Sequence, residues 1–182
     1  MSQAEPIVLE TERLYVRPWR AGDIDPMRTL FTDPQVVRYL KDGKPWSEEQ
    51  IAELVRFNID QRSGWEPGFF NCPLVLRDGD VVVGRVGINP LWDEHGNVDY
   101  GEPELEWDLI RSYWGRGLAT EAGRALLDYG FNVAGFDHLI AFAMPENKAS
   151  LRVMEKIGMH YWKTAPFRNK IITFYRLERP AG

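Results

Sequence analysis

The fold of this chain is decided by the stretch Trp114-Gly115-Arg116-Gly117-Leu118-Ala119-Thr120-Glu121-Ala122. It joins an alternating, strand-like segment to a segment with helical periodicity. Glycines at such a junction let the backbone approach a ligand closely. The unpaired N–H groups and the positive dipole end of a helix start attract anions, so a phosphate or pyrophosphate is the natural guest.

The segment before this stretch predicts a strand over residues 104–110 with two different faces. Its apolar positions are Leu105, Trp107 and Leu109, and its acidic positions are Glu104, Glu106 and Asp108. The segment after it predicts a helix over 118–131, with Glu121 facing water. A strand over 138–143, a helix capped by Asn147, and strands over 161–164 and 170–177 follow.

The N-terminal half predicts a strand over 7–19 and a short helix capped by Asp23. A longer helix begins at Ser47 in a capping box with Gln50, and Gly64 ends it. Asp78-Gly79 indicates a hairpin between strands 69–76 and 81–89, and residues 90–103 are expected to form a loop. The fold class is therefore α/β (α+β): a single domain, residues 1–182, with one mixed, mostly antiparallel sheet and about four flanking helices.

Composition excludes several classes of function. The chain has 182 residues, a net charge of −5 and one cysteine. The acidic balance argues against nucleic-acid binding, and no apolar run approaches the ~20 residues that span a bilayer. The absence of a signal-peptide pattern and the lone Cys72 fit a cytoplasmic protein. His95, His138 and His160 lack metal-ligand spacing, so no metal is expected.

Two phosphate-binding motifs compete for residues 114–122 on spacing alone. The P-loop is excluded, because no G-x-x-x-x-G-K-[ST] occurs. The dinucleotide fingerprint nearly fits, with Thr120 at the third glycine position and Asp137 twenty residues after Gly117. However, Asp137 precedes its strand, and the motif lies far from the first βα unit.

A third motif fits residues 114–122, and two further segments of the chain match the same family. Three segments, in this order, resemble the GNAT superfamily of N-acetyltransferases, in the branch that acetylates ribosomal-protein N-termini. They are Leu9-Glu10-Thr11-Glu12-Arg13-Leu14, then residues 113–122, and Asn147-Lys148-Ala149-Ser150-Leu151-Arg152-Val153-Met154-Glu155-Lys156-Ile157-Gly158-Met159. The resemblance spans nearly the whole chain. One departure is Trp114, which stands where the family loop usually has Gln or Arg.

The resemblance implies a GNAT-like domain in which two strands splay apart around acetyl-CoA, the cosubstrate. By the match, the pyrophosphate is held mainly by backbone N–H groups of Arg116, Gly117, Leu118, Ala119 and Thr120. The backbone of Leu109 and Ile110 is expected to bind the pantetheine. Asn147 and Ser150 are expected to face the pantetheine and the sulfur.

Acetyl transfer to an amine needs a base, a polarised carbonyl and a stabilised thiolate. Between Asp93 and Asp108 there are seven acidic residues and no Lys or Arg. Glu104 aligns with an acidic residue often found before the family's strand pattern, so it is the preferred base, with Glu106 or a water chain as alternatives. Many family members use a tyrosine acid where this chain has Met154. Ser150 resembles the serine proposed for that role, and it also fits a cofactor contact.

The sequence therefore predicts an acetyl-CoA-dependent N-acetyltransferase acting on a primary amine, either a protein N-terminus or a small molecule. The alternative is a non-catalytic acyl-CoA-binding sensor. Expected partners are acetyl-CoA and the amine acceptor, with no nucleic acid and no membrane. Members of this branch often self-associate, which allows a homodimer. Trp46, Trp65 and Trp92 are candidates to line the acceptor pocket, and segments 33–47, 62–70 and 90–103 are expected to set acceptor choice.

Overall fold

The computed structural model describes residues 8–60, 66–93, 95 and 97–180. The strands are β1 (Leu9–Glu10), β2 (Leu14–Val16), β3 (Phe70–Leu76), β4 (Val81–Trp92), β5 (Val98–Leu109), β6 (His138–Ala143), β7 (His160–Phe167) and β8 (Lys170–Glu178). The α-helices are α1 (Ile24–Phe31), α2 (Pro34–Val37), α3 (Glu48–Asp60), α4 (Leu118–Asp128) and α5 (Lys148–Lys156). Gly64 and Trp65 lie outside the described residues.

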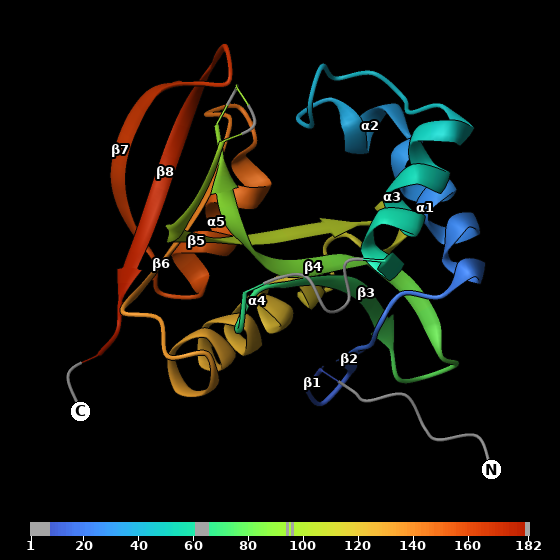
Figure 1. Cartoon of the computed structure of the whole chain (residues 1–182), viewed down its shortest axis with the longest axis horizontal. Helices are drawn as coiled ribbons and strands as arrows, with labels where there is room; N and C mark the ends of the chain where they lie inside the picture. Colours follow the sequence, from blue (N-terminus) through green and yellow to red (C-terminus); the bar gives the residue numbers. More distant parts are fainter. Residues whose placement is uncertain (1–7, 61–65, 94, 96, 181–182) are drawn as a thin grey trace.

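The strands form one sheet in the order β1-β2-β3-β4-β5-β6-β8-β7 (Figure 1). Every neighbouring pair in it is antiparallel except β5 and β6, which run parallel. That parallel pair is joined at a single register position, Glu104 opposite Ile140. The two strands part beyond it, which confirms the α/β fold with a mostly antiparallel sheet and a splayed strand pair.

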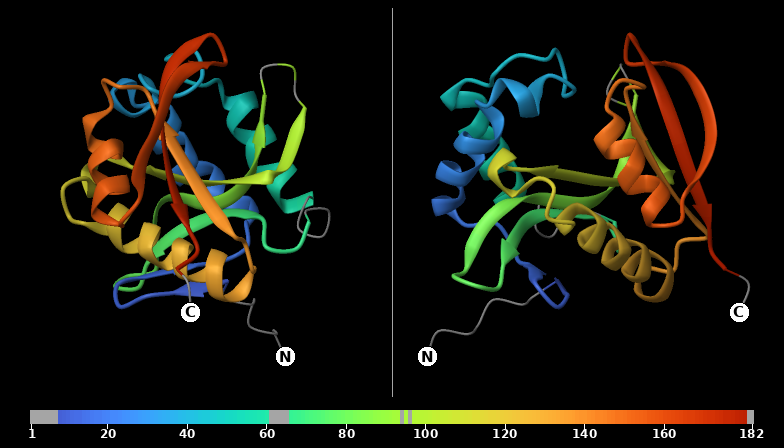
Figure 2. Two further views of the ribbon diagram at one scale, coloured as in Figure 1. Left: turned by 90° about the vertical axis from the view of Figure 1, so that its left-hand side faces the viewer. Right: turned by 180° about the vertical axis from the view of Figure 1, so that it is seen from behind.

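Helices cover the two faces of the sheet separately: α1 and α3 lie on one side of β3–β5, and α4 on the other (Figures 1 and 2). One core joins the sheet to α4 and α5, with Leu126 and Met154 almost fully buried in it. A second core joins α1, α2 and α3, and its centre is Phe31, stacked on Trp46 at 4.2 Å between ring centroids. No helix in the described ranges is long and apolar enough to cross a bilayer.

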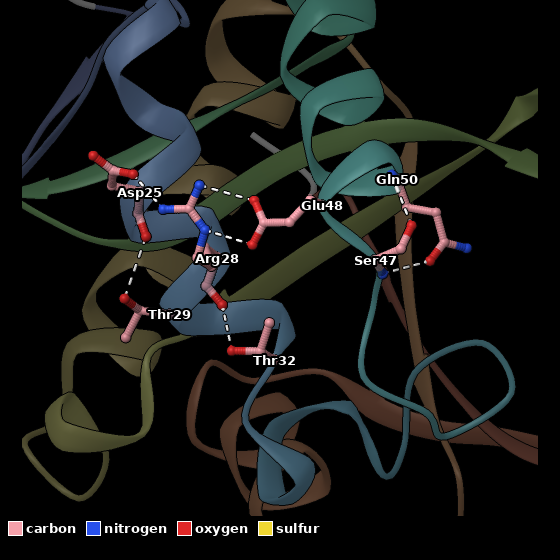
Figure 3. Close-up of polar contacts among 7 residues, drawn as sticks. All are labelled: Asp25, Arg28, Thr29, Thr32, Ser47, Glu48 and Gln50. Atoms are coloured by element: carbon pink, nitrogen blue, oxygen red, sulfur yellow. Dashed lines mark hydrogen bonds and ion pairs between the residues drawn. The ribbon is translucent and has the colours of Figure 1, made fainter.

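The capping box that begins α3 is confirmed (Figure 3). The Ser47 N–H donates to Gln50 Oε1 at 2.8 Å, and the Gln50 N–H donates to Ser47 Oγ at 3.2 Å. Next to it, Arg28 of α1 donates from Nε and Nη2 to the two carboxylate oxygens of Glu48, at 2.6 and 2.8 Å. These contacts fix the start of α3 against α1, on the side of the sheet that carries the acidic face of β5.

The prediction of one strand over residues 7–19 was wrong. The described part forms two short strands, β1 and β2, joined by a tight turn in which the Thr11 N–H donates to the Leu14 carbonyl at 2.8 Å. Glu121 of α4 holds this turn in place through hydrogen bonds. Its carboxylate accepts bonds from the Thr11 hydroxyl and from Arg13 Nε, both at 2.6 Å, so it does not face water as expected. Figure 2 shows the β1–β2 hairpin alongside α4.

Residues 90–103 were also predicted wrongly, because most of them belong to β4 and β5 rather than to a loop. This range contains two prolines, and proline usually breaks a strand. Here Pro90 and Pro103 lie opposite each other, and the register shifts directly after them, between Pro90 and Leu91. An irregularity of this kind tolerates the missing N–H groups. The predicted helix over 118–131 ends as α4 at Asp128 and continues as a π-helical turn, Tyr129–Val133.

Asp23 lies at the N-cap position of α1 as predicted, but its carboxylate does not bond to that helix. It accepts two bonds from Arg17, at 2.9 and 2.7 Å, and one from the Arg20 N–H at 2.7 Å. The side chains of Arg17 and Asp23 are only 7% and 4% exposed. This buried ion pair fixes the chain between β2 and α1.

Replacing Asp23 with alanine is expected to lower the free energy of unfolding by about 3–5 kcal/mol, because it leaves the Arg17 charge buried without its partner. Asp25→Ala is the matched control. Asp25 also pairs with an arginine, Arg28, but its side chain is 81% exposed. Its loss should cost about 1 kcal/mol or less. Urea unfolding of both variants measures the difference, and equal losses would contradict the role assigned to the buried pair.

Candidate functional site

A cavity of about 340 Å³ opens where β5 and β6 part. Glu104, Glu106 and Asp108 of β5 line one side of it, and Asn147 and Ser150 at the start of α5 line another. The acidic face of β5 and the capping turn of α5 were identified separately in the sequence. The fold brings them into one cavity because α5 follows β6, the strand that turns away from β5.

The opposite wall comes from the segment between α2 and α3. Tyr39, Lys41 and Trp46 line the cavity there, and the Lys41 ammonium lies 4.0 Å from the Trp46 ring centroid. The Tyr39 hydroxyl donates to the Glu146 carbonyl at 3.2 Å, which joins this wall to the turn before α5. Trp46 is thus a cavity residue as predicted, whereas Trp92 is not among those that line it.

The acidic face of β5 is partly neutralised from the neighbouring strands. Arg85 of β4 lies opposite Asp108 and donates to it from Nε at 2.9 Å. The same guanidinium forms an ion pair with Glu106. Two amides also donate to Glu106 Oε2, from Asn71 at 2.7 Å and from Asn89 at 2.8 Å. Glu106 and Asp108 therefore share a compensating cation.

Glu104 differs from its two neighbours. It is half-buried at the cavity, and within the described ranges its carboxylate accepts no hydrogen bond. Burial, followed by the negative charge of Glu106, raises the pKa of Glu104 to about 8. Burial also raises the pKa of Asp108, although Arg85 opposes that shift. A carboxyl group that titrates at this pH in a cavity is suited to proton transfer near neutral pH.

The helix that carries Ser150 begins as predicted. Asn147 is the N-cap of α5, and its Oδ1 accepts from the Ser150 N–H at 3.3 Å. Both side chains line the cavity. Met154, one turn later, lines it as well and is 1% exposed. The position where many relatives in the resembled family carry a tyrosine is therefore occupied here by an apolar side chain.

The predicted anion loop leads directly into α4. Gly115 and Gly117 have φ values of 74° and 78°, a left-handed conformation that favours glycine. The first backbone bond of the helix runs from the Glu121 N–H to the Gly117 carbonyl at 3.0 Å. The N–H groups of Leu118, Ala119 and Thr120 precede that bond, so they have no partner within the helix. An open hollow of about 640 Å³ borders Gly117 and Thr120.

At the end of β5 the backbone of Ile110 makes bonds within the protein. Its N–H donates to the Val83 carbonyl at 2.9 Å, and its carbonyl accepts from the Tyr113 N–H. The only backbone donor of Ile110 is therefore used within the protein. Because antiparallel ladders alternate, the N–H of Leu109 points away from β4, toward the parting of the strands. The Leu109 carbonyl accepts from Trp114 Nε1 at 2.7 Å.

Sequence reasoning missed Arg85, Asn71 and Asn89. The signal was present for Arg85, a lone cation in the apolar run 81–89. Only the strand register, which the sequence does not display, places it opposite Asp108. For metals, no group of three or more His, Cys, Asp or Glu side chains that could hold an ion is found among residues 8–60, 66–93, 95 and 97–180.

Comparisons with known proteins agree with the fold. A family model described as an acetyltransferase (GNAT) domain matches residues 13–160. The uncharacterized protein YkkB of Bacillus subtilis is 40% identical over 146 residues, 80% of each chain. A GNAT-family acetyltransferase structure from Bacillus anthracis superposes with a TM-score of 0.79 at 28% identity, covering 96% of this chain and 99% of that one.

A more distant structure shares the fold alone. It is the spermidine N-acetyltransferase of Vibrio cholerae in complex with CoA and spermine, with a TM-score of 0.72 at 14% identity. The superposition covers 93% of this chain and 97% of that one.

Glu104→Gln is expected to become more stable relative to the wild type as pH rises from 5 to 9. The wild-type carboxyl holds its proton up to about pH 8 when folded, against a reference pKa of 4.5. Between these values the folded chain binds more protons than the unfolded chain, so wild-type stability falls as pH rises. The full shift sets an upper bound of about 5 kcal/mol.

Urea unfolding at several pH values measures this difference. The control is Glu49→Gln, since Glu49 is exposed on α3. A difference between wild type and Glu104→Gln that stays constant over this pH range would contradict the raised pKa.

Proposed function

The chain belongs to the GNAT acetyltransferase family, and we propose that it transfers an acetyl group from acetyl-CoA to a primary amine by direct attack in a ternary complex. Family members depend on acetyl-CoA, so the donor follows from membership. The proposal rests on one observation above all: the cavity at the parted strands is lined by both Glu104 and Ser150. A base and a hydroxyl in one cavity are what the two proton transfers of this reaction require.

Glu104 takes the proton of the acceptor amine, directly or through one water. An ammonium group cannot attack a carbonyl, because its nitrogen has no free electron pair. A carboxylate with a pKa of about 8 is a stronger base than an ordinary glutamate and is ionised in a growing fraction of molecules above neutral pH. Asp108, which is paired with Arg85, is a poorer proton acceptor in this arrangement.

The backbone N–H of Leu109 polarises the thioester carbonyl, since it points toward the parting of the strands. The amine nitrogen forms a bond to that carbon, and the C–S bond breaks. As the amide forms, the nitrogen loses its second proton and the thiolate gains one. The Ser150 hydroxyl relays that proton, donating its own to the thiolate and accepting the one from the nitrogen, or only hydrogen-bonds to the thiolate. Asn147 supports this role, because its bond to the Ser150 N–H fixes the first turn of α5.

The pyrophosphate of the donor binds at the start of α4. The residues proposed to hold it are Arg116, Gly117, Leu118, Ala119 and Thr120. Unpaired N–H groups and the helix dipole favour an anion there. Glu121 supports this loop indirectly, since it accepts bonds from Arg13, and Arg13 Nη1 donates to the Arg116 carbonyl at 3.0 Å.

The acceptor is a protein N-terminus or a small-molecule amine. The resemblance to ribosomal-protein acetyltransferases favours the first, and the spermine bound to the Vibrio cholerae structure favours the second. We place the reaction in the cytoplasm, in keeping with the single cysteine of the chain. A non-catalytic acyl-CoA sensor remains the second candidate, since the α4 loop alone would serve binding.

Gly117→Trp is expected to abolish acetyl-CoA binding, because the indole would project from the loop where the pyrophosphate binds. Isothermal calorimetry measures the loss. The matched control is Gly135→Trp. Gly135 also has a positive φ, 81°, and its added Cβ would meet Arg179 Nη2 at 3.7 Å, much as the Cβ at Gly117 would meet Arg13 Nη2 at 3.6 Å. Gly135 follows the π-helical turn at the far end of α4. Equal affinity of the two variants would contradict the assigned binding loop.

Wild-type protein is expected to release CoA thiol from acetyl-CoA only when an acceptor amine is present. A panel of spermine, an amino sugar and peptides with free N-termini tests this. Glu104→Gln should lower kcat/KM by about 10²–10⁴-fold, the usual contribution of a general base. Ser150→Ala should slow the reaction less, and Glu49→Gln should not change it.

The same assay separates the two candidate functions. Tight binding of acetyl-CoA without thiol release from any amine would support the sensor. Release that Glu104→Gln does not change would exclude Glu104 as the base.

A further inference from the structure

Glu106 is the most heavily hydrogen-bonded carboxylate in the cavity. Arg85 donates to its Oε1, and both Asn71 and Asn89 donate to its Oε2. Asn71 and Arg85 are themselves buried, at 8% and 9% exposure. Three donors from two strands, β3 and β4, thus converge on one carboxylate of β5. These three donors leave few acceptor positions of the Glu106 carboxylate free.

We infer that Glu106 is a positioning residue for the proposed transfer: a fixed negative charge beside Glu104 that does not itself accept the acceptor's proton. This inference rests on the proposed function, in which Glu104 is the base. It also separates the two carboxylates that the sequence leaves as alternatives. Glu106 is held by donors, whereas Glu104 accepts no hydrogen bond from the described residues.

The geometry couples the two groups through the strand they share. Residues two apart on a strand point to the same face, with Cα atoms roughly 7 Å apart. Glu104 and Glu106 both line the cavity, and burial weakens the screening between them. A fixed charge on Glu106 therefore opposes ionisation of Glu104, while a cationic amine entering the cavity would be attracted to both.

Other charges act on Glu104 from three elements, and Lys41, in the segment between α2 and α3, lines the same cavity. Asp108 of β5 opposes its ionisation, and Arg85 of β4 and Arg168, in the turn between β7 and β8, favour it. Arg85 is shared with Glu106, so removing the Glu106 charge also leaves Arg85 less compensated. Both consequences of losing Glu106 favour ionisation of Glu104, and the sign of the expected effect is therefore unambiguous.

The test is a pH titration of Glu104 in the free protein, followed by NMR of chains labelled with ¹³C at the glutamate carboxyl carbons. Glu104→Gln identifies the signal. In the wild type the midpoint is expected at about 8. Glu106→Gln should lower that midpoint by about one unit, as expected for loss of a close like charge. Asp108→Asn should lower it by less, and it serves as a second variant if Glu106→Gln does not fold.

Asn89→Ala is the matched control, because it removes one donor to Glu106 without removing the charge. It should destabilise the protein and leave the Glu104 midpoint in place. A midpoint unchanged in both Glu106→Gln and Asp108→Asn would overturn the inference. So would a shift in Asn89→Ala as large as that in Glu106→Gln, since this would indicate a purely structural role.

Thiol release connects the titration to the reaction. With an amine that supports turnover, the rising limb of kcat/KM against pH should move to lower pH in Glu106→Gln, by the same amount as the NMR midpoint. If Glu106→Gln removes activity at every pH while Glu104→Gln retains it, the proton acceptor is Glu106 and the inference is wrong. If no amine supports turnover in the wild type, the proposed function fails, and the titration still decides whether the two carboxylates are coupled.

Discussion

The single register pair between β5 and β6 is the constraint on which this molecule depends. Elsewhere the sheet is held by antiparallel ladders, but Glu104 and Ile140 are the only aligned pair of the parallel strands among the described residues. Past that point the two backbones are not paired with each other, and a space opens between the strands. The cavity, the Leu109 N–H that points away from β4 and the place of α5 residues in the cavity lining all follow from this one separation.

The parting also explains why charged side chains are tolerated so deep in the fold. A strand buried on both sides would normally carry apolar residues only. Here one face of β5 packs on α4 through Leu105 and Leu109, and the other opens on the cavity. Arg85 makes the second face possible, because its guanidinium pairs with Glu106 and Asp108 at once. Of the three acidic residues on this face, Glu104 alone is not ion-paired with Arg85, and its ionisation is correspondingly costly.

Much of the fold and of the candidate site could be predicted from the sequence. The rest depends on which residues of neighbouring strands lie opposite each other. The glycines at 115 and 117, the alternation over 104–110 and the Asn147 cap are local patterns, and local patterns predict local structure. The β4–β5 hairpin was missed, and its two prolines, Pro90 and Pro103, are tolerated because they lie opposite each other next to a register shift. The engagement of Ile110 and the pairing of Arg85 depend on which residues face each other across β4 and β5, and no periodicity within one strand reveals that.

The bond from the Tyr39 hydroxyl to the Glu146 carbonyl has a consequence for how the protein is made. It joins two walls of the cavity across 107 positions of sequence. A contact between residues so far apart in sequence forms later than local contacts, because closing the long loop between them costs conformational entropy. During synthesis the segment that contains Tyr39 would leave the ribosome well before the segment that contains Glu146 is made. The cavity is thus complete only once the chain extends through α5, whose first turn supplies one of its walls.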